Sequence, residues 1–524
     1  MDVNEARRAG RAPLAAPPAD VSWRTDTLAL AFGVLAFGLH GLVAGRYDVF
    51  RDELYFIVCG RHPAFGYADQ PPVAPLVAAG FYALGHSLWL LRLPASLAAG
   101  GLAWLAVRFA RLLDGGPISA AVAALSVTLA PMLMGVTATL GTTTFDPLAW
   151  TAMAWCLAHA VKTGDRRALW LCGVIAGVDL EIKYALFFWG VSLVIGLGLT
   201  GERKLLARTS LWCAAALGAL IAAPSFVWQA LHGFPFRDLA AAAHEKNADI
   251  PPLPFLWNQV VVMNPFLAPV WVSGVVAPFL IAHLRPVRFL SIAFVTCVGL
   301  VIATHGKDYY PAAGYPVMFI IGAVALPRWI DVEKRRGAWI AGAAAAVTFS
   351  AAIAPLVLPI LPVPLLKAYV RHFPLKLQQQ EKSFRGTLLP QAFADQLGWR
   401  DFVAQVSDAW ARIPPSERAR TSIKVDNYGE AAALEVYGRP GVLPPPLSGH
   451  NQYFLWGPRG QDPVNLLVVQ DHPERLAPYC QQTGVLATTS SPDAMRHENG
   501  KAIAYCRGLR ADVKTLWPQL KSYY

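Results

Sequence analysis

Long apolar runs fill the first two-thirds of the chain, and polar residues collect in the short stretches between them. A helix that crosses a membrane needs about 20 consecutive, mainly apolar residues. By this measure the pattern predicts about eleven transmembrane helices. They lie roughly at residues 28–45, 88–108, 117–137, 144–161, 168–180, 183–200, 209–231, 259–284, 287–304, 309–327 and 338–365. The fifth and sixth runs are short, so a hairpin that crosses only partly is an alternative for this pair.

The apolar stretch at 72–86 is predicted to lie along the membrane surface instead of crossing it. Only about three helical turns follow Pro75, which is too short for a span. Counting the stretch as a span would also place Arg108 and Arg111 on the outer side of the membrane. We therefore expect an interfacial helix here.

From about residue 366 the long apolar runs stop, and charged residues and glutamine become more frequent. Residues 421–425, 466–470 and 502–506 have strand-like sequences, and residues 430–437 have a helix-like sequence. The pattern therefore predicts a mostly α-helical, polytopic membrane protein that carries a C-terminal α/β domain. The expected units are a tail at 1–27, a membrane domain at 28–365 with its first external loop at 46–87, and a soluble domain at 366–524.

The composition and the charge distribution set the orientation. Of the 524 residues, 55% are hydrophobic and 15% are charged, whereas soluble proteins average about 25% charged residues. With the N-terminal tail inside, most Lys and Arg residues of the short loops face the cytoplasm, as the positive-inside rule requires. The net charge of +11 follows from this topology, so no nucleic-acid partner is expected. We expect a plasma (inner) membrane protein with a cytoplasmic N-terminus and an extracytoplasmic, periplasmic C-terminal domain.

The cysteines show no spacing typical of metal ligands. Cys480 and Cys506 both lie in the polar C-terminal part. Two cysteines in an oxidising compartment can form a disulfide, and the sequence leaves open whether these two are bonded.

The segment 47–72, read as a loop after the first apolar run, has the highest concentration of polar residues in the membrane domain. Asp52, Glu53 and Asp69 are its candidate catalytic carboxylates. A carboxylate at a membrane rim is partly desolvated, which raises its pKa towards the range that suits a general base. The alternatives are an ion pair of Asp52 with Arg51 or Arg61, a Glu53 side chain that points away, and helix capping by Asp69.

Two further charged residues lie in or beside apolar runs. Arg92 lies inside a predicted span, where a charge marks either function or a buried pair. Asp146 precedes Pro147 at the start of another span, and helix capping is sufficient to explain it.

The Asp52-Glu53 pair and the segment Tyr67-Ala68-Asp69-Gln70-Pro71-Pro72 resemble the first external loop of polytopic glycosyltransferases of the GT-C type. The resemblance is to the protein O-mannosyltransferase and lipid A aminoarabinose-transferase (ArnT-like, glycosyltransferase family 39) group. It implies a GT-C-like fold, an essential role for Asp52 as general base and a site role for Asp69. The aminoarabinose transferases carry a lysine where this chain has Gln70, which argues against that particular substrate.

The resemblance also implies a polyprenyl-phosphate-linked sugar donor and a lipid, glycan or protein acceptor at the external face of a membrane whose lipids surround the protein. No cofactor is expected to be required for this transfer, although the clustered carboxylates also suit a divalent cation. Positive charge must hold the donor phosphate, and two Lys-Tyr contexts resemble those of the family. An alternative for the lysines is snorkelling to the interface. The candidate phosphate-binding residues are Lys183, Tyr184, His305, Lys307, Tyr310 and Arg61.

The segment 448–458 combines aromatic rings with amide and imidazole groups, as sugar-binding surfaces do. Its candidate glycan-binding residues are His450, Asn451, Tyr453 and Trp456. A folded loop with ordinary core aromatics is the alternative, and we favour it. Two other classes of function stay open for the whole chain: a flippase or transporter of lipid-linked sugars, and a non-catalytic envelope protein that binds glycan.

Overall fold

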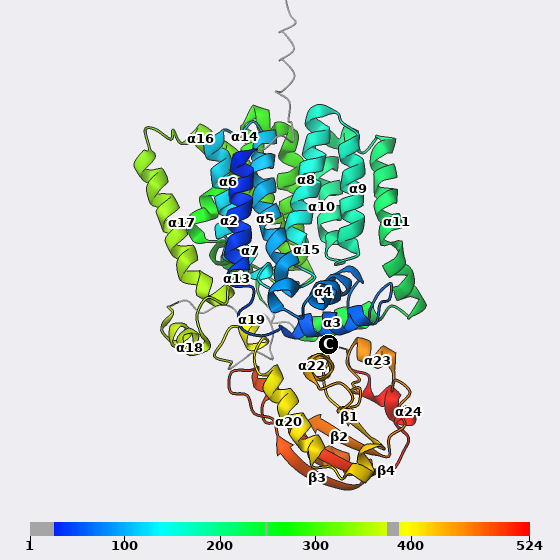
Figure 1. Ribbon diagram of the computed structural model, residues 1–524. Helices are drawn as coiled ribbons and strands as arrows, with labels where there is room; N and C mark the ends of the chain where they lie inside the picture. The colour runs from blue at the N-terminus through cyan, green and yellow to red at the C-terminus, as the bar shows by residue number, and fades with distance from the viewer. Residues whose placement is uncertain (1–25, 247–249, 375–386, 524) are drawn as a thin grey trace, which may run out of the picture.

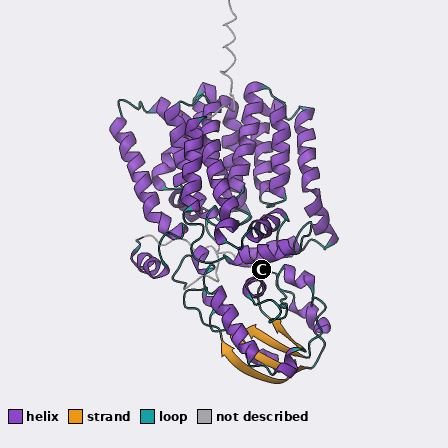
Figure 2. Ribbon diagram, viewed as in Figure 1, coloured by secondary structure: helices purple, strands orange, loops and turns teal. Residues whose placement is uncertain are grey.

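Helices stand side by side in a bundle, and a smaller domain with all the strands lies at one end of it (Figures 1 and 2). The computed structural model describes residues 26–246, 250–374 and 387–523. The predicted tail at 1–27 lies almost wholly outside these ranges. The N-terminal end of the first helix and the soluble domain are at opposite ends of the bundle (Figure 1).

Each predicted span coincides with one helix or with two consecutive helices of the bundle. These helices are α2 (Thr27–Gly41), α5 (Leu88–Leu112), α6 (Pro117–Leu129), α7 (Pro131–Val136), α8 (Asp146–Thr163), α9 (Arg167–Leu180), α10 (Leu186–Gly198), α11 (Thr209–Leu231), α13 (Pro252–Val262), α14 (Ala268–Leu280), α15 (Arg288–Ala303), α16 (Tyr315–Trp329) and α17 (Arg336–Val357).

Among the described residues, 5 helices are by themselves long and apolar enough to cross a membrane, or up to 6 if the pair 252–262 and 265–280, bent by 90°, is one span. Others are shorter because the sequence interrupts them. Pro131, for example, ends α6 at the preceding turn and starts α7, since proline disfavours helical backbone in the residue before it. The fold is that of a polytopic membrane protein, and the count of eleven spans stays a prediction.

The polar segment at 51–61 forms helix α3 (Arg51–Arg61), so the expectation of a loop there was wrong. Glu53 caps the helix, because its carboxylate accepts a hydrogen bond from the Phe50 N–H at 2.9 Å. The predicted interfacial stretch at 72–86 forms α4 (Val73–Ala83). Both helices lie across the end of the bundle that faces the soluble domain (Figure 1). They pack so closely that a Cβ at Gly60 would lie 2.2 Å from the Pro75 carbonyl oxygen.

The soluble domain is built on a four-stranded sheet in the order β1-β2-β4-β3. The strands are β1 (Thr421–Lys424), β2 (Asn465–Gln470), β3 (Cys480–Thr488) and β4 (Ala502–Leu509). β1 and β2 are parallel, and the other two pairs are antiparallel. The predicted strands match β1, β2 and β4, and the predicted helix matches α22 (Tyr428–Tyr437). β3 was not predicted because it is an edge strand whose mostly exposed residues lack an apolar alternation.

Short helices connect the two parts and complete the soluble domain. The longest of them, α20 (Trp399–Ala411), packs against α22 and β3. The others are α18 (Val363–His372), α19 (Gln391–Ala394), α21 (Pro415–Arg418), α23 (Gln452–Trp456) and α24 (Val513–Leu516). A further short helix, α12 (Pro235–Lys246), lies between α11 and α13 in the chain.

One hydrophobic core runs through the boundary between the two parts. The buried residues 54–58 of α3 share it with Trp399 and Val406 of α20 and with residues 431–434 of α22. Burying apolar surface from both sides stabilises this junction. The soluble domain is therefore packed directly on the helix that carries Asp52.

Cys480 and Cys506 form a disulfide that joins β3 to β4. We expect the double variant Cys480→Ser, Cys506→Ser to lower the unfolding free energy of the soluble domain by about 2–4 kcal/mol, because the bond restricts the unfolded chain. Thermal unfolding in detergent, with and without reductant, measures this. Cys213→Ser, which removes an exposed free thiol, is the control. An unchanged midpoint after reduction of the wild type would contradict the expectation.

Candidate active site

A cavity of about 530 Å³ opens where the 69–71 segment meets the ends of α9, α10 and α11. Its lining includes three charged side chains, from Asp69, Lys183 and Arg237, and eight aromatic rings. The remaining lining residues are Gln70, Pro71, Thr142, Ile182, Tyr184, Ala185, Phe187, Phe188, Phe226, Gln229, Phe234, Phe236, Tyr309 and Tyr310. A mainly apolar hollow with a few convergent polar groups is the usual form of a small-molecule site.

Lys183 lies just past the end of α9, where its backbone N–H bonds to the Asp179 carbonyl at 2.7 Å. Its ammonium group is 3.5 Å from the Asp146 carboxylate and donates to the Thr143 hydroxyl at 2.5 Å. It also lies 5.1 Å from the ring centroid of Tyr310, a distance at which cation–π attraction contributes. Three predicted phosphate-binding residues, Lys183, Tyr184 and Tyr310, therefore line one cavity.

Asp69 is held from two sides. Its Oδ1 accepts a hydrogen bond from the Tyr55 hydroxyl at 3.0 Å, and its Oδ2 accepts one from the Asn451 amide at 2.9 Å. Burial raises the pKa of Asp69 to about 6, the negative charge of Asp52 also raises it, and the two donors oppose the shift. Asp69 thus titrates just below neutral pH, where a carboxylate can still ionise and work.

Asp52 lies in the first turn of α3 and faces the soluble domain. Its Oδ1 accepts a hydrogen bond from the Tyr428 hydroxyl at 2.7 Å, and the Arg51 guanidinium is 3.6 Å away. Burial raises the pKa of Tyr428, so its hydroxyl stays protonated and donates. The Asp52 side chain is 37% exposed and is not part of the cavity lining. The ion pair with Arg51, considered from the sequence, is thus present.

Glu53 serves the fold, and this corrects the catalytic contact expected for it. Its carboxylate is fully buried and accepts from the Arg92 guanidinium at 2.9 Å and from the Leu140 N–H at 2.8 Å, in addition to capping α3. Arg92 also donates to the carbonyls of Ala44, Arg46 and Asp48 and to the Gln396 side chain. The structure therefore assigns Arg92 to the buried pair and leaves Glu53 no oxygen that faces the cavity.

Three predicted phosphate-binding residues do not line the cavity: His305, Lys307 and Arg61. Lys307 lies beside it, 5.9 Å from the ring centroid of Tyr309. Arg61 is at the far end of α3 from Asp52, and its side chain is exposed. Of the two lysines selected for their neighbouring tyrosines, Lys183 lines the cavity and Lys307 does not. A role of either lysine in phosphate binding stays a prediction.

The predicted glycan-binding segment forms part of the boundary between the two domains. His450, Asn451 and Tyr453 are buried, and the Tyr453 ring packs 6.3 Å from that of Tyr55 on α3. Trp456 packs 5.1 Å from the His62 ring. The buried rings of His450 and Tyr453 cannot stack on a sugar, which favours the alternative of a folded segment with core aromatics. Trp456 is partly exposed. Asn451 contacts a carboxylate of the site, that of Asp69.

Several residues of the site were missed or given less weight from the sequence. Asp146 and Asp179 are buried, and both influence the surroundings of Lys183. Their signal was present, because carboxylates inside apolar runs are costly and usually functional. Gln229 is also buried and donates to the Tyr67 carbonyl at 2.9 Å, which ties α11 to the segment before Asp69.

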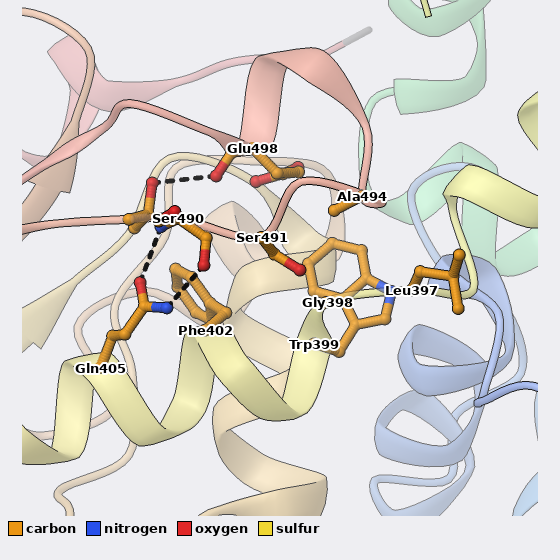
Figure 3. Close-up of a pocket in the computed structure, with 10 residues that line it drawn as sticks. Leu397, Gly398, Trp399, Phe402, Gln405, Ser490, Ser491, Ala494 and Glu498 are labelled. Carbon is orange, nitrogen blue, oxygen red and sulfur yellow. Dashed lines mark hydrogen bonds between the residues drawn. The ribbon is translucent and has the colours of Figure 1, made fainter. Parts of the chain in front are cut away.

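A second hollow lies inside the soluble domain, between α20 and residues 489–498 (Figure 3). Its volume of about 10 Å³ is space for one water molecule. The Gln405 side chain bridges it by exchanging hydrogen bonds with the backbone of Ser490 (Figure 3). No predicted site residue lines this hollow, so it is a packing feature and not a sugar site.

Residues 69–228 match the family model described as dolichyl-phosphate-mannose-protein mannosyltransferase. No curated protein matches the sequence. Among solved structures, the fold resembles that of ArnT from Cupriavidus metallidurans, both bound to undecaprenyl phosphate and in the apo state. For both structures the TM-score is 0.59 and the identity 16%, over 91% of this chain and 97% of that one.

The fold is less similar to that of the oligosaccharyltransferase of Archaeoglobus fulgidus in the apo form. The TM-score is 0.42 and the identity 14%, over 80% of this chain and 65% of that one. The similarity to arabinosyltransferase EmbB from Mycobacterium smegmatis is comparable. The TM-score is 0.41 and the identity 16%, over 62% of this chain and 33% of that one. The resemblance expected from the Asp52-Glu53 pair and the 67–72 segment is thus confirmed. In its fold, and in sequence over residues 69–228, the chain resembles the ArnT-like group of polytopic GT-C-type glycosyltransferases.

Proposed function

We propose that this protein is a membrane glycosyltransferase that moves a sugar from a polyprenyl-phosphate donor to a hydroxyl of an envelope lipid, glycan or protein. The observation that supports it best is the cavity in which Lys183 and Asp69 share a mostly aromatic lining. A cation suits the donor phosphate, aromatic faces suit a sugar ring, and a carboxylate suits its hydroxyls. The ArnT structure bound to undecaprenyl phosphate supports the choice of donor.

The lipid part of the donor has an apolar groove to occupy. This groove, of about 480 Å³, lies between α8, α9, α10 and α11 and is lined almost wholly by apolar side chains. Phe187 lines both the groove and the cavity, so the two spaces meet at one residue. An isoprenoid chain in the groove would place its phosphate at the end of α9, where Lys183 lies.

In the proposed step, Asp52 acts as general base. It takes the proton of the acceptor hydroxyl, the acceptor oxygen bonds to the anomeric carbon, and the bond from that carbon to the phosphate oxygen breaks. The polyprenyl phosphate leaves as an anion and needs no acid. Asp69, ionised above its pKa of about 6, orients sugar hydroxyls. The acceptor reaches the half-exposed Asp52 from the domain boundary. The step requires no cofactor.

The same arrangement supports the proposed location of the site. α3, α4 and the soluble domain are at the end of the bundle opposite the start of α2 (Figure 1). The cavity is lined by residues 69–71, which lie between α3 and α4 in the chain. We place this end outside the plasma membrane, because the positive-inside rule puts the N-terminus in the cytoplasm. Lipid-linked sugars and envelope acceptors meet at that face.

We expect Lys183→Met to raise the KM for the donor by about 10- to 100-fold, with a smaller effect on kcat. A hydrogen bond to a charged group contributes about 1.5–3 kcal/mol, and each 1.4 kcal/mol changes a dissociation constant about tenfold. Initial rates in proteoliposomes, measured against donor concentration and in competition with undecaprenyl phosphate, test this.

Lys307→Met is the matched control, since Lys307 lies outside the cavity lining, and its KM should stay within about threefold of the wild type. Thermal unfolding of both variants separates loss of binding from loss of fold, because Lys183 also neutralises buried Asp146. A raised KM for Lys307→Met with an unchanged KM for Lys183→Met would overturn the assignment of the phosphate site.

A further inference from the structure

Asn451 has a backbone conformation that side chains other than glycine rarely adopt. Its φ is 49° and its ψ is −126°. With φ positive and ψ strongly negative, the Cβ crowds the backbone, whereas glycine, lacking a Cβ, adopts this region freely. Strained residues of this kind persist only where the surroundings hold them, and they are concentrated at functional sites.

The C-terminal end of the chain holds this strained backbone in place. The Asn451 N–H donates to the Ser522 carbonyl at 3.1 Å, and the Ser522 N–H donates to the Gly449 carbonyl at 2.9 Å. The contact is close, since a Cβ at Gly449 would lie 1.8 Å from the Leu520 carbonyl oxygen. Residues 449–451 and 520–522 therefore form one rigid pair of segments.

The Asn451 side chain points at the membrane domain. The residue is 2% exposed, and its Nδ2 donates to Oδ2 of Asp69. Its Oδ1 is buried without a hydrogen-bond partner. Exchanging the two atoms would turn an oxygen towards a carboxylate, so the amide is fixed in the donating orientation. An unsatisfied buried oxygen and a strained backbone are both unfavourable, and both result from holding this one donor against Asp69.

The next residue fixes the same carboxylate from the other side. The Gln452 side chain accepts from the Ala68 N–H at 2.9 Å, and the Gln452 N–H donates to the Tyr55 hydroxyl at 3.1 Å. That hydroxyl in turn donates to Oδ1 of Asp69. Both oxygens of Asp69 are thus oriented by contacts that depend on residues 451 and 452 of the soluble domain.

We propose that Asn451 is a positioning residue of the transfer site, held under backbone strain by the soluble domain so that its amide orients Asp69 and stabilises the ionised form of that carboxylate. The inference rests on the proposed function, because it gives Asp69 a part in sugar transfer. The soluble domain then completes the site in the membrane domain instead of serving as a separate glycan-binding module.

The ionisation of Asp69 responds to groups on every element around it. Burial and the charge of Asp52 favour its protonated form, while the donors Tyr55 and Asn451 favour its charged form. Loss of the Asn451 donor therefore raises the pKa of Asp69 further. The titratable and charged groups around it are Asp52, Tyr55 and Cys59 of α3, Tyr428 of α22, Tyr523, and Lys183 and Arg237 across the cavity.

The decisive variant is Asn451→Gly, which removes the donor and the strain together. We expect the acidic limb of the pH profile of kcat/KM to move up by about one pH unit, while the unfolding midpoint stays level or rises. Asn451→Ala keeps the strain, so it should shift the pH profile similarly and unfold earlier than Asn451→Gly. A side chain with a merely structural role would lower stability when removed and leave the pH profile unchanged.

The control is Asp114→Gly. Asp114 also has a positive φ, of 62°, but it lies between α5 and α6 in the chain and does not line the cavity. Relief of its strain should leave the pH profile unchanged. An unshifted acidic limb for Asn451→Gly, with the wild type active, would overturn the positioning role.

If the wild type transfers no sugar, that result refutes the proposed function alone, and the pH dependence of stability then tests the contact between Asn451 and Asp69. Because the pKa of Asp69 is raised from 3.8 to about 6 on folding, the folded protein keeps a proton that the unfolded chain loses, so stability falls as pH rises through this window. In Asn451→Gly this fall should extend to higher pH. Asp69→Asn should remove the contribution of Asp69 and make the pH dependence the same in both backgrounds, while Asp395, whose pKa burial also raises to about 6, continues to contribute. An identical pH dependence of the midpoint in Asn451→Gly and wild type would overturn the inference.

Discussion

Asp52→Asn should lower kcat for sugar transfer by about 100-fold or more, because a positioned general base contributes roughly 10²- to 10⁴-fold to the rate. The substitution keeps the size of the side chain and its contact with the Tyr428 hydroxyl, and removes the charge and the base. Its cost in stability should be below about 1 kcal/mol, because the ion pair with Arg51 spans 3.6 Å and the Asp52 side chain is 37% exposed.

Asp48→Asn is the matched control in the same stretch of chain. Asp48 accepts from the Tyr437 hydroxyl at 2.5 Å and pairs with Arg400 at 2.8 Å, so its loss should affect the domain contact and leave kcat within a fewfold of the wild type. Retention of full kcat by Asp52→Asn would refute its role as base. Asp69, which lines the cavity, would then be the carboxylate to test.

Arg92→Met should destabilise the protein by about 3–5 kcal/mol, because it leaves the fully buried carboxylate of Glu53 without its cation. Proteins are stable by only about 5–15 kcal/mol, so a large drop in unfolding midpoint and in yield is expected. Thermal unfolding in detergent, together with the amount recovered from membranes, measures this.

The double variant Arg92→Met, Glu53→Gln distinguishes an unpaired charge from a packing defect. Removing both charges takes away the unpaired carboxylate, so the double variant should recover part of the loss. A double variant that is less stable than Arg92→Met, or a single variant that unfolds like the wild type, would contradict the structural role assigned to this pair.

Apolar runs were a reliable guide to where the bundle helices lie, because burial in a membrane demands them. Residues 51–61 were the clearest error in the membrane domain. Their charges suggested a loop, yet residues 54–58 are apolar and are buried beneath the soluble domain. The sequence carried a signal for this helix in Glu53, the third helical residue, whose carboxylate caps the preceding backbone. The helix was not predicted because the charged residues were taken to be exposed.

The contacts that assemble the site join residues far apart in the chain. Asp69 and Asn451 are separated by 382 positions, and Asp52 and Tyr428 by 376. No local pattern reports such a contact, because periodicity and capping reflect neighbours within a turn or two. Lys183 was identified since its position at a span end beside a tyrosine is a local feature. The role proposed for Asn451 could be inferred only from its backbone conformation together with its contact with Asp69.

We propose above all that the protein transfers sugar from a lipid-linked phosphate bound in the cavity that Asp69 and Lys183 line. The measurement that tests it most directly is the fate of labelled sugars in proteoliposomes that hold a panel of polyprenyl-phosphate sugars and envelope extract as acceptor. We expect the wild type to attach label to an extracted lipid, glycan or protein and to release polyprenyl phosphate, and we expect Asp52→Asn to do so at least about 100-fold more slowly. Movement of the intact lipid-linked sugar between leaflets, with no donor consumed by the wild type, would contradict it and identify the protein as a flippase.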